Sequence, residues 1–133
     1  MVSTHEYNRS YMPHVLVIED DVQLRRYLKE LLEGEAYVIY EASNGIQGLS
    51  MYETNHPDIV LTDIVMPDME GLEFITMLKK QNPETPIIAM SGGNQGYGEN
   101  HLQTAVKLGA EYALSKPFTS KELLENIREL LKS

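Results

Sequence analysis

Short apolar runs alternate with longer amphipathic stretches along most of this chain. Five of the runs are bounded by turn residues and are short enough to be strands. Runs that are apolar throughout are typical of parallel strands covered on both faces. We therefore expect strands at residues 14–18, 37–40, 59–62, 87–90 and 112–115.

A stretch with apolar positions at helical spacing follows each of these runs. In the first, Val22, Tyr27 and Leu28 belong to the apolar set that we expect to face the core, and Gly34 is the expected C-terminal cap. Ile46 is an inward position of the second helix. The expected helices span residues 22–33, 43–55, 70–81, 99–108 and 119–131.

Capping residues support two of these helix starts. Ser43 or Asn44 provides the N-cap of the second helix. Thr119 and Glu122 have the spacing of a capping box at the start of the last one.

Five strand–helix units in succession predict an α/β fold with a parallel sheet, right-handed crossovers and helices on both faces. The expected architecture is a flavodoxin-like (βα)5 three-layer sandwich with strand order 2-1-3-4-5. Residues 14–133 form this domain. Residues 1–13 are polar and aperiodic, and we expect a flexible tail from which Tyr7 and Tyr11 rest on the domain.

Composition narrows the possible functions. The chain has 133 residues, which favours one domain, and it has no cysteine, which excludes disulfides and thiolate metal sites. The net charge of −9 argues against nucleic-acid binding through a basic surface. No apolar run is long enough for a membrane span and no signal peptide is recognisable, so the expected location is cytoplasmic.

Polar residues follow four of the five expected strands. Glu19 and Asp20 follow the first strand, Asp63 the third, Ser91 the fourth and Lys116 the fifth. Each has an ordinary alternative: Asp63 as a helix cap, the acidic pair as a helix N-terminal cluster, Ser91 as a turn residue, Lys116 as a solvated charge. Their common place at the carboxyl edge of a parallel sheet outweighs these alternatives, because open α/β sheets bind ligands there.

Three carboxylates close together repel one another, and a hard divalent cation relieves that repulsion. Mg²⁺ prefers oxygen ligands and is usually held by one or two carboxylates together with phosphate oxygens. Lys116 adds a positive charge and Ser91 a hydroxyl donor. The expected site therefore suits a doubly negative phosphoryl group.

Four motifs, in this order, give the chain a specific resemblance to a known family. They are Val-Ile-Glu-Asp-Asp, Leu-Thr-Asp-Ile-Val-Met-Pro-Asp-Met-Glu-Gly, Met-Ser-Gly and Ser-Lys-Pro-Phe. Residues 14–131 resemble the receiver domain of bacterial two-component response regulators.

The resemblance implies a role for each site residue. Asp63 is the implied nucleophile and phosphoacceptor, Asp20 binds Mg²⁺ (or Mn²⁺) directly, and Glu19 binds it largely through water. Asp63 and the backbone carbonyl of Val65 complete the implied metal ligands. 

The other implied roles concern the phosphoryl group. Ser91 hydrogen-bonds it and Lys116 pairs with it, and the Lys116–Pro117 peptide bond is expected to be cis.

The resemblance also implies partners. A sensor histidine kinase or a histidine phosphotransfer protein donates the phosphoryl group, and the domain then changes conformation to signal to a downstream target. That target is expected on the surface formed by the fourth helix, fifth strand and fifth helix. The domain is thus a phosphoacceptor rather than an enzyme, with no membrane contact and no direct nucleic-acid binding.

Two features depart from the family pattern. Ala113 stands where many relatives carry a switching aromatic residue, with Tyr112 one position earlier. The loop at 92–98 has four glycines and is longer than expected, so we expect it to be mobile without phosphate and its backbone to carry the output.

Three other functions fit the sequence less well. An aspartate-nucleophile phosphatase would need its nucleophile after the first strand, and a flavodoxin-like FMN carrier would need a hydroxyl- and glycine-rich loop there. A degenerate receiver that only binds a partner is disfavoured by the intact set of site residues. Whether the receiver acts alone or was excised from a longer protein stays open.

Overall fold

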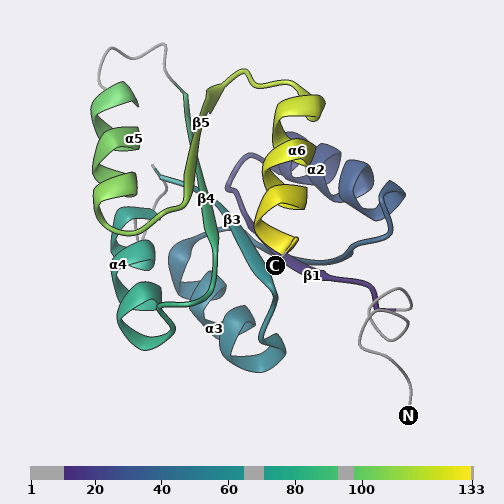
Figure 1. The fold of residues 1–133 in the computed structure, drawn as a ribbon, viewed down its shortest axis with the longest axis horizontal. Coiled ribbons are helices and arrows are strands. Elements are labelled where there is room, and N and C mark those ends of the chain that lie inside the picture. Colours follow the sequence, from purple (N-terminus) through teal and green to yellow (C-terminus); the bar gives the residue numbers. More distant parts are fainter. Residues whose placement is uncertain (1–10, 65–70, 93–97, 133) are drawn as a thin grey trace.

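The computed structural model describes residues 11–64, 71–92 and 98–132, and these form one parallel sheet covered by helices (Figure 1). Each strand is followed by a helix, as the sequence pattern predicts. The strands are β1 His14–Ile18, β2 Val38–Ala42, β3 Ile59–Asp63, β4 Ile87–Gly92 and β5 Tyr112–Lys116. The helices are α2 Val22–Gly34, α3 Gly45–Asn55, α4 Gly71–Gln81, α5 Gly98–Lys107 and α6 Ser120–Leu131.

The sheet has the predicted strand order β2-β1-β3-β4-β5, and all its pairs are parallel. In Figure 1, α2 and α6 lie on one side of the sheet, and α3, α4 and α5 lie on the other. This is the flavodoxin-like three-layer sandwich, and the predicted fold class is confirmed. None of the described helices is long and apolar enough to cross a membrane.

Alternate side chains of the strands build two separate cores. Val15 and Val17 of β1 pack toward the layer of α2 and α6, whereas Leu16 and Ile18 pack toward α3, α4 and α5. Every residue of β3 is buried because both faces of this strand are covered. The apolar run 59–61 is thereby explained, and Asp63 follows Thr62 at the carboxyl end of the strand.

Side-chain caps fix where three helices begin. Asp21 accepts hydrogen bonds from the amides of Gln23 and Leu24 at the start of α2. Asn44, one of two residues expected to cap the second helix, is the N-cap of α3. The capping box predicted at Thr119 is present, because its hydroxyl accepts from the amide of Glu122 and the Glu122 carboxylate accepts from the amide of Thr119.

The end of α2 differs from the expectation. Gly34 is still helical, Glu35 is the C-cap, and the left-handed residue is Ala36 with φ of 67°. The amides of Ala36 and Tyr37 bond back to the carbonyls of Glu33 and Leu32, so backbone bonds close the helix without a glycine.

Three apolar residues expected to face the core are exposed instead. Leu28 and Leu32 form the buried stripe of α2, whereas Val22 and Tyr27 lie outside it and are 55% and 50% exposed. Ile46 in the first turn of α3 is 59% exposed. The apolar periodicity predicted these helices correctly but overestimated how much of each helix surface is buried.

The segment before β1 is partly tied to the domain. The Tyr11 hydroxyl donates to the Asp58 carboxylate at 2.5 Å, and the Tyr11 ring stacks on His14. The contact predicted for Tyr11 is therefore present. Residues 1–10, including Tyr7, lie outside the described part of the chain, as does most of the glycine-rich loop.

Candidate functional site

Asp63 is the last residue of β3 and lies at the carboxyl edge of the sheet. It pairs in register with Met90 of the neighbouring strand β4 and is only 6% exposed. A carboxylate so shielded from water needs a positive or hydrogen-bonding partner. Lys116 provides one, since its Nζ lies 3.0 Å from Asp63 Oδ2.

Lys116 ends β5 and connects two buried acids. Its ammonium group donates to Glu19 Oε1 at 2.8 Å as well as to Asp63. The Lys116–Pro117 peptide bond is cis, as the resemblance implies. Burial by itself lowers the pKa of Lys116, but the hydrogen bond to Glu19 and the two negative charges outweigh it, so the pKa lies above its usual value.

Glu19 follows β1 and is almost completely buried, with 1% of its surface exposed. The pKa of its carboxyl is raised to about 7. Burial is the largest cause, the hydrogen bond from Lys116 opposes it, and the nearby charge of Asp63 adds to the rise. The other carboxylate oxygen accepts a hydrogen bond from the Asp21 amide at 3.1 Å.

Glu19, Asp20 and Asp63 can present one carboxylate oxygen each within 4.8 Å of one another. Such oxygens are the ligands that hard divalent cations prefer. Asp20 is exposed whereas the other two acids are buried, so a cation here would be reached from solvent on the side of Asp20. The donor set fits a metal ion of this class, and the predicted acidic cluster is present.

Ser91 lies near this cluster along the sheet edge. It follows Met90, the register partner of Asp63, and pairs with Ser115, the residue before Lys116. It is 3% exposed. The structure thus brings Ser91 to the predicted edge, whereas Val65, the predicted backbone ligand, lies outside the described residues.

Gly71 supports the backbone of Asp63 in a way that the sequence did not indicate. Gly71 lies within the helix expected at 70–81 and is the buried first residue of α4, and its amide donates to the carbonyl of Ile64 at 2.8 Å. A Cβ atom here would lie 2.0 Å from the Asp63 carbonyl oxygen and 2.6 Å from Ile64 Cα. Only glycine fits at this distance.

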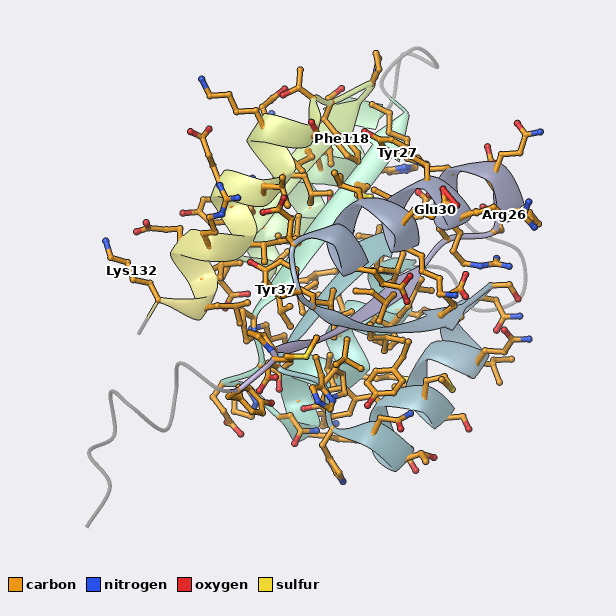
Figure 2. All side chains as sticks on the ribbon, turned by 90° about the vertical axis from the view of Figure 1, so that its right-hand side faces the viewer. Arg26, Tyr27, Glu30, Tyr37, Phe118 and Lys132 are labelled. Carbon is orange, nitrogen blue, oxygen red and sulfur yellow. The ribbon has the colours of Figure 1, made fainter. Side chains whose placement is uncertain are left out.

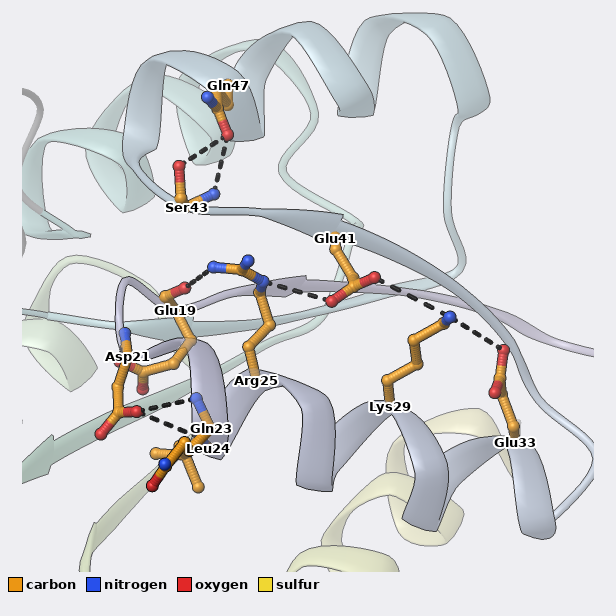
Figure 3. Close-up of polar contacts among 10 residues, drawn as sticks. All are labelled: Glu19, Asp21, Gln23, Leu24, Arg25, Lys29, Glu33, Glu41, Ser43 and Gln47. Carbon is orange, nitrogen blue, oxygen red and sulfur yellow. Dashed lines mark hydrogen bonds and ion pairs between the residues drawn. The ribbon is translucent and has the colours of Figure 1, made fainter.

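Arg25 and Glu41 are two further residues that the sequence analysis missed. Arg25 donates from Nη1 to the carbonyl oxygen of Glu19 at 2.7 Å and from Nε to Glu41 of β2 at 3.2 Å (Figure 3). The second strand was expected to contribute no polar group to the site. The available signal was that Glu41 directly follows the strand expected at 37–40. In the structure it lies within β2 and pairs in register with Val17.

A pocket of about 470 Å³ opens beside Lys116. Figure 2 shows Tyr27 of α2 and Phe118 at the same end of the molecule, and both line this pocket. Its other lining residues are Asp21, Leu24, Gly92, Lys116 and Pro117. The pocket would let a ligand or partner side chain approach Lys116, whose side chain is partly exposed.

Comparison with known proteins agrees with this geometry. A family model described as the response regulator receiver domain matches residues 15–128. The chemotaxis protein CheY of Halobacterium salinarum is 34% identical over 117 residues, which are 88% of this chain and 95% of that protein. The KDP operon transcriptional regulatory protein KdpE of Escherichia coli is 35% identical over 121 residues, 91% of this chain but only 52% of KdpE.

Solved structures show the same fold. A CheY-like receiver domain protein from Methanospirillum hungatei JF-1 superposes with a TM-score of 0.84 at 29% identity, covering 92% of this chain and 95% of that one. The receiver domain of Francisella response regulator 1452 has a TM-score of 0.81 at 32% identity, covering 90% and 97%. The chain therefore spans nearly all of some relatives and about half of KdpE.

Proposed function

Because this chain belongs to the response regulator receiver domain family, which acts in two-component phosphorelay signalling, we propose that Asp63 is its phosphoacceptor. A signalling phosphoacceptor, rather than a classical enzyme, is what this family provides. The observation that carries the assignment is the Lys116 ammonium group, which contacts both Asp63 and Glu19 at the sheet edge.

In the proposed reaction, a carboxylate oxygen of Asp63 attacks the phosphorus of a phosphohistidine in line with the P–N bond. That bond breaks, its electron pair stays on the imidazole, and a mixed anhydride forms on Asp63. The Lys116 ammonium group neutralises charge on the phosphoryl oxygens, because its flexible stem lets Nζ move from the Asp63 carboxylate to the phosphoryl group. The Ser91 hydroxyl donates a hydrogen bond to the product.

We propose that Glu19, Asp20, Asp63 and the Val65 carbonyl hold Mg²⁺ (or Mn²⁺). The proximity of the three acidic side chains supports this, because oxygen ligands within 4.8 Å of one another suit a hard cation. When bound, the ion supplies positive charge that offsets the negative charge developing on the transferring phosphoryl group.

The proposed donor is a sensor histidine kinase or a histidine phosphotransfer protein, and the proposed location is cytoplasmic, as is usual in this family. We assign the downstream contact to α5, β5 and α6. Figure 1 shows β5 at the edge of the sheet between these helices. The net charge of −9 supports a protein partner rather than direct nucleic-acid binding.

Incubation with acetyl phosphate and Mg²⁺ tests this function. Intact mass spectrometry is expected to show one added phosphoryl group, and the adduct should be absent when EDTA removes the cation, because the acids then repel the incoming phosphoryl group. Restoring excess Mg²⁺ to the same sample is the control for damage to the protein. An adduct that forms equally well in EDTA would contradict a metal-dependent site.

A further inference from the structure

The Glu19–Asp20 peptide group is held by a side chain from outside the acidic cluster. Arg25 of α2 donates from Nη1 to the Glu19 carbonyl oxygen at 2.7 Å, as Figure 3 shows. Arg25 Nε in turn donates to Glu41 at 3.2 Å, so the outer strand β2 orients the guanidinium group. The Arg25 side chain is 18% exposed, which restricts its alternative rotamers.

These contacts fix the backbone on one side of Asp20. A peptide group is planar, so holding the Glu19 carbonyl also holds the Asp20 amide and sets the position of the Asp20 Cα. On the other side, the Asp21 amide donates to Glu19 Oε2 at 3.1 Å, and the Asp21 side chain caps α2. Asp20 is exposed, so its position depends on these two neighbouring peptide groups.

We infer that Arg25 is a positioning residue for the metal site: it acts through the Glu19 carbonyl to place Asp20 beside the other two acids. The inference rests on the proposed function, since it assumes that the acidic cluster binds a divalent cation. Arg25 does not touch the reacting atoms in this account. Glu41 contributes to the same positioning, because it holds the guanidinium group of Arg25.

Arginine suits this task better than lysine. The planar guanidinium group reaches the Glu19 carbonyl and the Glu41 carboxylate with two different nitrogens at once. A lysine would keep the charge but has one nitrogen on a flexible stem, so it would not fix both partners with the same geometry. Charge alone therefore cannot replace Arg25.

The sign of the effect separates positioning from simple electrostatics. Removing a positive charge near three carboxylates should strengthen cation binding if only charge matters. Removing the residue that places Asp20 should weaken it. Lys29 provides a matched control: it lies one turn further along α2, and its Nζ pairs with Glu33 and Glu41, each at 4.0 Å, instead of with the Glu19 carbonyl.

The experiment titrates Mg²⁺ into phosphate-free protein by isothermal calorimetry and compares wild type with Arg25→Gln, Arg25→Lys and Lys29→Gln. We expect roughly tenfold weaker Mg²⁺ binding for both Arg25 variants, in the range for residues that orient metal ligands. Lys29→Gln should bind within about twofold of wild type, or slightly more tightly, because an exposed charge is screened by salt. Circular dichroism melts establish which variants are folded.

The outcomes are distinguishable. If a folded Arg25→Gln binds Mg²⁺ as tightly as wild type or more tightly, the inference is overturned while the proposed function stands. If Arg25→Gln does not fold, Arg25→Lys decides, and wild-type affinity in that variant also overturns it. Failure of the wild-type protein itself to bind Mg²⁺ would overturn the proposed metal site, and with it this inference.

Discussion

The Asp63→Asn variant is expected to gain no phosphoryl group from acetyl phosphate under conditions in which the wild type gains one. An amide has nearly the size of the carboxylate but lacks its nucleophilic oxygen, so the acceptor is lost while the space is filled. Asp63 is 6% exposed and bonded to Lys116 at the sheet edge. Intact mass spectrometry of both proteins measures the result.

Asp58→Asn is the matched control for that experiment. Asp58 precedes β3, at the opposite end of the strand from Asp63, and accepts hydrogen bonds from Tyr11 and the His14 amide. The same chemical change there should leave phosphorylation intact. Equal adducts in Asp63→Asn and wild type would show that the acceptor lies elsewhere.

Gly71→Ala is expected to damage the site without changing any polar side chain. The new Cβ would lie 2.0 Å from the Asp63 carbonyl oxygen, so the backbone of β3 or the start of α4 must move. We expect a loss of roughly 1–3 kcal/mol in the free energy of unfolding, as for other overpacked positions. Displacement of the nucleophile should also slow phosphorylation roughly 10- to 100-fold. Denaturant titration and timed mass spectrometry measure the two effects.

Gly34→Ala separates steric conflict from loss of glycine flexibility. A Cβ at Gly34 meets nothing within 4 Å, and this residue is the exposed helical end of α2. This variant should be neutral or more stable by about 0.4–1 kcal/mol. If Gly71→Ala also proved neutral in stability and in phosphorylation rate, the account of its packing against Asp63 would be wrong.

The sheet and the acidic cluster could be predicted because they depend on local patterns. A fully buried strand such as β3 is apolar at 59–61, with only Thr62 before the acid, and parallel connectivity then brings the ends of β1, β3, β4 and β5 to one edge. Glu19, Asp63 and Lys116 meet there as expected. Their motifs also identified the family, which the comparisons confirmed.

The support around the cluster could not be predicted, because it depends on tertiary distances. Nothing in the sequence shows that Gly71 touches the backbone of Asp63, or that Arg25 reaches a carbonyl six residues earlier in the chain. Similarly, Gly34 was expected to be the C-terminal cap of α2. The residue with the left-handed conformation is instead Ala36, where backbone hydrogen bonds close the end of the helix. The general preference for glycine at a helix end was overridden here by the backbone hydrogen bonds of the following residues.

Tyr112 does not replace the aromatic residue that is absent at position 113. Tyr112 packs into the core between the sheet and the layer of α2 and α6, whereas the following residue of a strand points to the other face. Tyr112 is therefore on the wrong face to substitute for an aromatic at Ala113. The prediction that the loop after β4 carries the output stays a prediction, since residues 93–97 lie outside the described part.

The most direct test of the central claim identifies the phosphorylated residue chemically. After incubation with Mg²⁺ and acetyl phosphate, borohydride reduction converts an aspartyl phosphate to homoserine, and peptide mass spectrometry locates the converted residue. We predict conversion at position 63, and none in a sample kept in EDTA. Conversion at another aspartate with position 63 unchanged, or a phosphoryl group that resists reduction, would contradict the account.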